Sequence, residues 1–69
     1  MPSFEQRRTE LYRLAAKVLG SAANGREWMR APALGLNGQV PADLIRTVEG
    51  AKQVETLLMQ IEYGVHVSS

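Results

Sequence analysis

The fold is decided by the stretch from Trp28 to Val65, which reads WMRAPALGLNGQVPADLIRTVEGAKQVETLLMQIEYGV. Glycines and prolines divide this stretch into short segments, and apolar residues recur at helical spacing in its last third. The pattern predicts an all-α fold, a small compact bundle of about four helices. Two helices are expected to be long, at about residues 3–19 and 48–63, and two short, at about residues 25–31 and 41–46.

Helix ends are marked before the decisive stretch as well. Ser3 with Gln6 has the spacing of a capping box, in which side chains satisfy the free backbone N–H groups of a first helical turn. Gly20 suits the left-handed conformation that often ends a helix. Asn24 with Glu27 repeats the capping-box spacing, so we expect the second helix to start there.

The first part of the decisive stretch predicts a loop. Pro32 must end the second helix, because proline disfavours helical geometry in the residue before it. Residues 32–40 are rich in turn-forming residues and are expected to be irregular, with Leu34 and Leu36 tucked under the domain. Trp28 is expected to point into the core.

The last part of the stretch predicts the main helix. Pro41 suits the first position of a third, short helix, and Thr47 has the character of an N-cap for the fourth, which Gly64 ends. Leu57 and Val65 lie beside the apolar seam of this helix and are the residues most available to a partner. The seam itself, expected to be core, consists of Ala51, Val54, Leu58 and Ile61.

The chain is small, and its composition limits what can stabilise it. Its 69 residues predict one domain over residues 1–69, with residues 65–69 as a flexible C-terminal tail. The sequence has no Cys and one His, which excludes disulfides and a Cys/His zinc site, and no cofactor is expected. We therefore expect oligomerisation or a protein partner to add stability. No apolar run approaches the roughly 20 residues that span a bilayer, so the predicted location is cytoplasmic, without membrane contact.

Catalysis and sequence-specific DNA binding both lack the residues that they need. Acid/base or nucleophilic chemistry requires positioned partner groups, whereas the one histidine, His66, stands in the predicted tail. We expect no enzyme. A helix-turn-helix uses a tight turn of about three or four residues, and here about nine separate the second and third helices. The chain is expected to hold no such domain and to make no direct sequence-specific contact with DNA.

Turn-forming and helix-forming residues also recur at characteristic separations through the decisive stretch. They are Trp28-Met29, Pro32, Leu34, Gly38, Pro41, Asp43-Leu44-Ile45, Thr47, Glu49-Gly50, Val54, Leu58 and Ile61-Glu62-Tyr63-Gly64-Val65. The combination resembles the toxin-binding domain of the Xre/MbcA/ParS antitoxins, closely over residues 28–65 and more loosely over the first helix. Gly38 suits a turn, and Gly50 lets another element approach closely.

The resemblance implies a partner and a mechanism. Members of that family pair with RES-domain toxins, which degrade NAD, and neutralise them by docking so that the C-terminal segment blocks the NAD pocket. Gln60 stands where relatives often have arginine, and it lacks the charge and the fork of a guanidinium. The resemblance also implies a homodimer, or a higher hetero-oligomer with the toxin, and a toxin-binding site made of Leu57, Gln60, Ile61, Tyr63, Gly64, Val65, His66 and Val67.

Two other functions are compatible with the sequence. A homo-oligomerisation module without a toxin partner would use the remaining apolar surface for self-association. Nonspecific nucleic-acid binding would use Arg7, Arg8 and Arg13 on the first helix and would depend steeply on salt.

Overall fold

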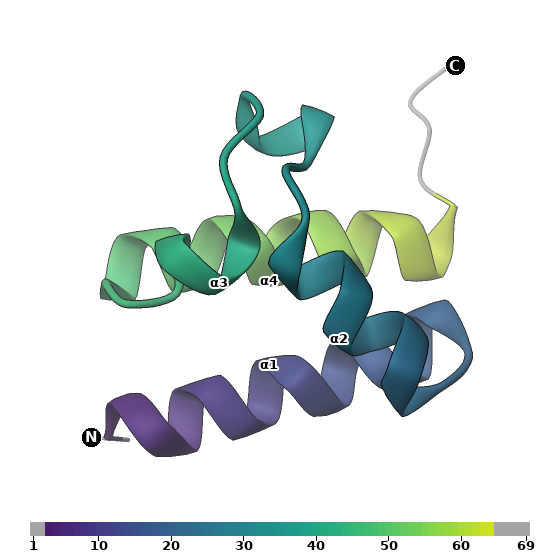
Figure 1. The fold of residues 1–69 in the computed structure, drawn as a ribbon, viewed down its shortest axis with the longest axis horizontal. Helices are drawn as coiled ribbons and strands as arrows, with labels where there is room; N and C mark the ends of the chain where they lie inside the picture. The colour runs from purple at the N-terminus through teal and green to yellow at the C-terminus, as the bar shows by residue number, and fades with distance from the viewer. Residues whose placement is uncertain (1–2, 65–69) are drawn as a thin grey trace.

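The computed structural model describes residues 3–64, which form four α-helices and one turn of 3-10 helix (Figure 1). The predicted all-α fold with two long helices is confirmed. None of the described helices combines the length and hydrophobicity needed to cross a membrane. In chain order the elements are α1 (Phe4–Leu19), α2 (Ala22–Arg30), η1 (Leu34–Leu36), α3 (Pro41–Leu44) and α4 (Val48–Tyr63).

The ends of both long helices follow the sequence signals. At α1 the capping box is complete, with the Gln6 amide donating to Ser3 Oγ and the Ser3 amide to Gln6 Oε1, both at 3.2 Å. At α4 the amide of Gly50 donates to Thr47 Oγ1 at 2.9 Å. Gly64 ends α4 in the left-handed conformation, with φ of 60°. Local side-chain chemistry therefore sets these boundaries.

The start of α2 was predicted wrongly. Its N-cap is Ser21, whose Oγ accepts from the Asn24 amide at 3.1 Å, so the helix begins at residue 22 rather than 25. The Asn24 side chain instead donates to the Leu19 carbonyl at 3.0 Å, which leaves no capping box with Glu27. Gly20 reverses the chain directly after α1, with φ of 99°, so only two residues separate the end of α1 from the start of α2.

The segment between α2 and α3 is more ordered than predicted. It contains η1 and an antiparallel bridge between Ala33 and Gln39. Leu36 is buried as expected, but Leu34 is 96% exposed, so the expectation that it tucks under the domain is wrong. Residues two apart on a three-residue turn point in different directions, and only one of the two leucines can face inward.

The third helix is shorter than predicted, because it ends at Leu44 rather than Arg46. The Ile45 amide still donates to the Pro41 carbonyl at 3.0 Å, but the next amide reaches only the carbonyl three residues back. The chain thereby tightens into a turn that leads directly into the Thr47 cap of α4.

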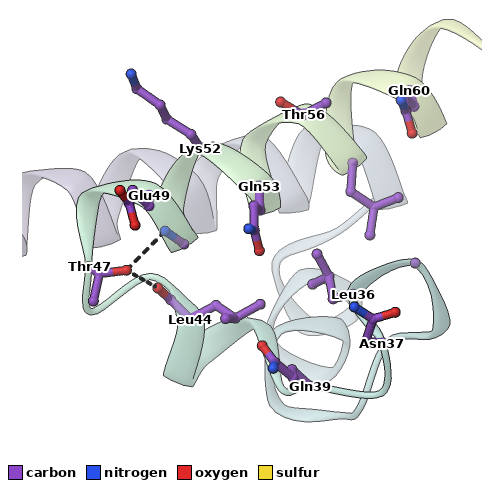
Figure 2. A pocket seen from close by; sticks show the side chains of 13 residues that line it. Leu36, Asn37, Gln39, Leu44, Thr47, Glu49, Lys52, Gln53, Thr56 and Gln60 are labelled. Carbon is purple, nitrogen blue, oxygen red and sulfur yellow. Dashed lines mark hydrogen bonds between the residues drawn. The ribbon is translucent and has the colours of Figure 1, made fainter.

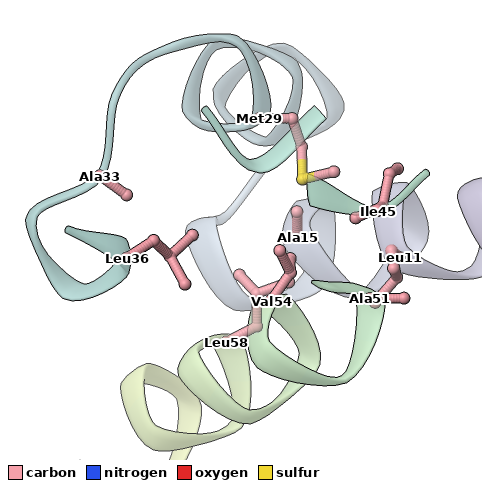
Figure 3. Close-up of a cluster of buried hydrophobic side chains, with 9 residues drawn as sticks. All are labelled: Leu11, Ala15, Met29, Ala33, Leu36, Ile45, Ala51, Val54 and Leu58. Atoms are coloured by element: carbon pink, nitrogen blue, oxygen red, sulfur yellow. The ribbon is translucent and has the colours of Figure 1, made fainter. Parts of the chain in front are cut away.

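The core lies between α1 and α4 and is closed by residues from every other element (Figure 3). Trp28 is half-buried and packs against the edge of this cluster, while its neighbour Met29 is fully buried within it. The buried hydrophobic side chains are Leu11, Ala15, Met29, Ala33, Leu36, Ile45, Ala51, Val54 and Leu58.

The two long helices lie side by side and run in the same direction (Figure 1). Near their C-terminal ends Lys17 Nζ lies 4.0 Å from a Glu62 carboxylate oxygen, an exposed pair that contributes little to stability. Near their N-terminal ends Arg7 Nε donates to the Ile45 carbonyl at 3.3 Å. Arg7 also donates to the Arg46 carbonyl at 3.5 Å, so α1 holds the turn between α3 and α4.

Two glycines allow backbones to touch. A Cβ at Gly50 would overlap the carbonyl oxygen of Leu44, which lies against the first turn of α4. A Cβ at Gly25 would lie 2.8 Å from the Ala16 nitrogen, where α2 crosses α1. Neither glycine has a positive φ. Glycine is therefore needed at these two positions because the backbones approach closely, and not because of its conformational freedom.

Gly50→Ala tests this close approach. Helix propensity alone would make the substitution stabilising by about 1 kcal/mol. Overlap with the Leu44 carbonyl should instead lower the free energy of unfolding by about 1–3 kcal/mol. Urea denaturation measures the sign. Thr56→Ala, an exposed control in the same helix, should change stability by less than about 0.5 kcal/mol; a stabilised Gly50→Ala variant would contradict the packing at this corner.

Arg7→Gln tests the link between α1 and the turn after α3. Loss of the donated hydrogen bonds should cost about 1 kcal/mol of unfolding free energy. Arg13→Gln serves as the control, because within residues 3–64 no hydrogen bond, ion pair or aromatic contact involves the Arg13 side chain. Thermal denaturation of the two variants should separate them, and equal melting temperatures would show that the link carries no stability.

Candidate functional site

The C-terminal end of α4 exposes apolar side chains. Met59 is 39%, Ile61 42% and Tyr63 65% exposed. Ile61 continues the seam of Val54 and Leu58, but the buried cluster ends at Leu58, so the expectation that Ile61 is core is wrong. Within residues 3–64, no buried side chain lies beyond Leu58 on this seam. The described part of α4 thus ends in exposed apolar surface of the kind that partners bind.

The structure divides the other predicted site residues. Leu57 is half-buried and covers the backbone of η1, since a Cβ at Gly35 would lie 3.0 Å from Leu57 Cδ1. It therefore has a packing role besides any binding role. Gln60 is exposed, and Gly64 is the left-handed C-cap of α4. Val65, His66 and Val67, like the predicted flexible tail at 65–69, lie outside the described residues.

A groove runs beside α4, bounded by α3 and by the segment that contains η1 (Figure 2). Its volume is about 740 Å³, and it is open to solvent. It joins two of the predicted site residues, Leu57 and Gln60, to residues that were not predicted to form a site. The lining residues are Gly35, Leu36, Asn37, Gln39, Leu44, Thr47, Glu49, Gly50, Lys52, Gln53, Thr56, Leu57 and Gln60.

One end of this groove is fixed by the α3–α4 corner. Thr47 Oγ1 accepts from the Gly50 amide and lies 3.4 Å from the Leu44 carbonyl oxygen, to which it donates (Figure 2). The hydroxyl thus satisfies one free amide of α4 and adds a second donor to the Leu44 carbonyl, which also accepts from the Thr47 amide at 3.2 Å. The corner is rigid because both backbone groups are held by the same side chain.

The polar groups that line the groove can form hydrogen bonds with a polypeptide chain. Its polar lining is mostly carboxamide and hydroxyl, with one carboxylate at Glu49 and one ammonium at Lys52. Within residues 3–64 no three His, Asp or Glu side chains lie close enough to hold a metal ion. Carboxamides donate and accept hydrogen bonds equally, which suits contact with another polypeptide.

The groove was missed because it forms between segments distant in the chain. Asn37 and Gly38 could have signalled part of it, since both take positive φ, 60° and 77°, and such pairs mark tight turns. The distance of that turn from α4 depends on how Leu36 and Leu57 pack. A local sequence pattern does not predict this packing.

Residues 14–64 match the model of the antitoxin Xre/MbcA/ParS C-terminal toxin-binding domain. The chain belongs to this family. The match begins within α1 and ends at Gly64, so it includes the whole groove and the exposed end of α4. The resemblance seen in the sequence is confirmed, and membership supports an antitoxin role.

One similar curated protein is an antitoxin, Antitoxin Xre of Pseudomonas putida. It is 33% identical over 51 residues, which cover 74% of this chain and 32% of the relative. The chain thus spans about a third of the length of that relative. No solved structure matches the chain.

Substitutions at the two ends of the α4 seam should have unequal effects on stability. Leu58→Ala should lower the free energy of unfolding by about 2–5 kcal/mol, because it empties a fully buried site. Ile61→Ala should cost about 1 kcal/mol or less, because part of that side chain is already in water. Chemical denaturation of both variants measures the difference. Similar losses would place Ile61 in the core after all.

Proposed function

We propose that this chain neutralises a RES-domain toxin, which degrades NAD, by docking on it and blocking its NAD pocket with the residues that follow α4. The partner is that toxin, in a homodimeric or higher hetero-oligomeric complex, and the place of action is the cytoplasm. The observation that carries the proposal is the family match, which ends at Gly64, immediately before residues 65–69.

The exposed end of α4 supports docking at this position. Ile61 and Tyr63 present apolar surface that the described part of the chain leaves in water. Tyrosine is enriched among the residues that contribute most to binding at protein interfaces, and Ile61 adds apolar area beside it. Gly64, in its left-handed conformation, ends the helix just after these anchors. In the proposed complex the anchors fix the helix end on the toxin beside the mouth of the pocket.

The length and chemistry of residues 65–69 suit obstruction. Five residues extend over at most about 17 Å, enough to enter a pocket that admits a dinucleotide. Their sequence, VHVSS, has no acidic or basic side chain apart from His66. In the proposed mechanism Val65, His66 and Val67 occupy the pocket and exclude NAD by volume. No catalytic group of the antitoxin is needed.

Removal of residues 65–69 tests the obstruction. The truncated chain should retain the helix content of the full chain in circular dichroism, because every described helix ends before residue 65. It should inhibit NAD hydrolysis by a RES-domain toxin at least about tenfold less strongly than the full chain. The truncated chain keeps the exposed anchors but lacks the segment that would block the pocket. A full chain with Ser68→Ala and Ser69→Ala, which keeps the length, is the matched control.

Three results would speak against the proposal. Undiminished inhibition by the truncated chain would show that residues 65–69 do not block the pocket. Failure of the full chain to bind a RES-domain toxin would show that such a toxin is not its partner. A self-associated chain that neither binds the toxin nor restores growth of cells expressing it would favour the homo-oligomerisation alternative, and light scattering would detect it.

A further inference from the structure

The segment of residues 33–39 has a fixed backbone and exposes the side chain of Leu34 to solvent. Its backbone is fixed at both ends and in the middle by hydrogen bonds of 2.9–3.1 Å. A segment with this many internal bonds loses little conformational entropy when it binds a partner. The bonds run from the amide of Ala33 to the carbonyl of Gln39, Leu36 to Ala33, Gly38 to Ala33, Asn37 to Leu34 and Gln39 to Leu36.

The two leucines of this segment have opposite surroundings. Leu36 is 7% exposed and anchors the segment in the core, whereas Leu34 is 96% exposed. Single exposed apolar residues are common and need no explanation by themselves. Leu34 differs because its backbone is fixed within the segment and because it directly precedes Gly35, which lines the groove and lies against Leu57 of α4.

The groove beside Leu34 is lined by four carboxamides. Asn37 and Gln39 come from the segment of residues 33–39, and Gln53 and Gln60 come from α4 (Figure 2). A carboxamide offers both a donor and an acceptor, as does each peptide group of an extended chain. The single acidic and single basic side chains, Glu49 and Lys52, cancel in charge. An uncharged polypeptide segment therefore fits this lining better than an anion or a cation.

We propose that Leu34 and this amide-lined groove form a second contact with the toxin, independent of residues 65–69. Leu34 enters an apolar depression on the toxin, and an extended, uncharged segment of the toxin lies along the groove. This inference rests on the proposed function. Its surface is continuous with the toxin-binding residues expected from the sequence, because Leu57 and Gln60 line the same groove.

Affinity measurements with the full chain and a purified RES-domain toxin test the second contact. Leu34→Asp should raise Kd about 30-fold, because a charged group replaces an apolar anchor. Gln53→Glu, which keeps the size but removes the donor, should raise Kd about fivefold. Val48→Asp is the matched control. Val48 is 54% exposed but lies outside the groove, and Asp suits the first turn of a helix.

The results separate this inference from the proposed function. If the full chain does not bind the toxin, both are overturned. If it binds and Leu34→Asp leaves Kd unchanged, only the second contact is overturned. If Leu34→Asp weakens binding while removal of residues 65–69 leaves inhibition intact, only the obstruction is overturned. Equal melting temperatures of wild type and Leu34→Asp would show that the loss is not misfolding.

Self-association has its own signature. If Leu34→Asp converts a dimer to a monomer in light scattering without changing Kd for the toxin, the face binds a second copy of this chain and the second contact is overturned. Repeating the affinity measurement in the chain without residues 65–69 should show a similar loss on Leu34→Asp. An effect that disappears there would contradict the independence of the two contacts.

Discussion

The carbonyl of Leu44 lies against the backbone of Gly50, and the position of α4 depends on that contact. Because no side chain intervenes, α3 and α4 meet at a corner tighter than ordinary helix packing allows. Thr47 bonds to both sides of the corner, and Arg7 holds it from α1. The corner sets where α4 begins, and so where its exposed C-terminal end and the wall of the groove lie.

Much of the fold could be predicted because side chains close in the sequence determine where helices begin and end. The Ser3 and Gln6 pair and the Thr47 cap act over three residues, so no tertiary information is needed to find them. The same logic failed for Asn24, which does not cap the helix. Ser21 takes that role, and Asn24 bonds back to α1, because the turn at Gly20 brings the two helices together.

The candidate site was predictable only in part. Family resemblance pointed to the end of α4, which does expose Ile61 and Tyr63. Periodicity placed Ile61 in the core, because spacing records which face a residue occupies but not how far along the helix its neighbours reach. The groove and the outward position of Leu34 required the structure. They depend on which of two leucines enters the core, a choice that packing makes and composition does not.

The shared direction of α1 and α4 has a consequence for how the domain is joined to other polypeptide. Ser3 and Gly64 fall at opposite poles of a body whose longest dimension is 37 Å (Figure 1). A module fused ahead of Ser3 would stand far from the end of α4, so its bulk would not shield the apolar surface there. An affinity tag or a fluorescent reporter placed at the same pole would likewise leave the apolar end of α4 uncovered.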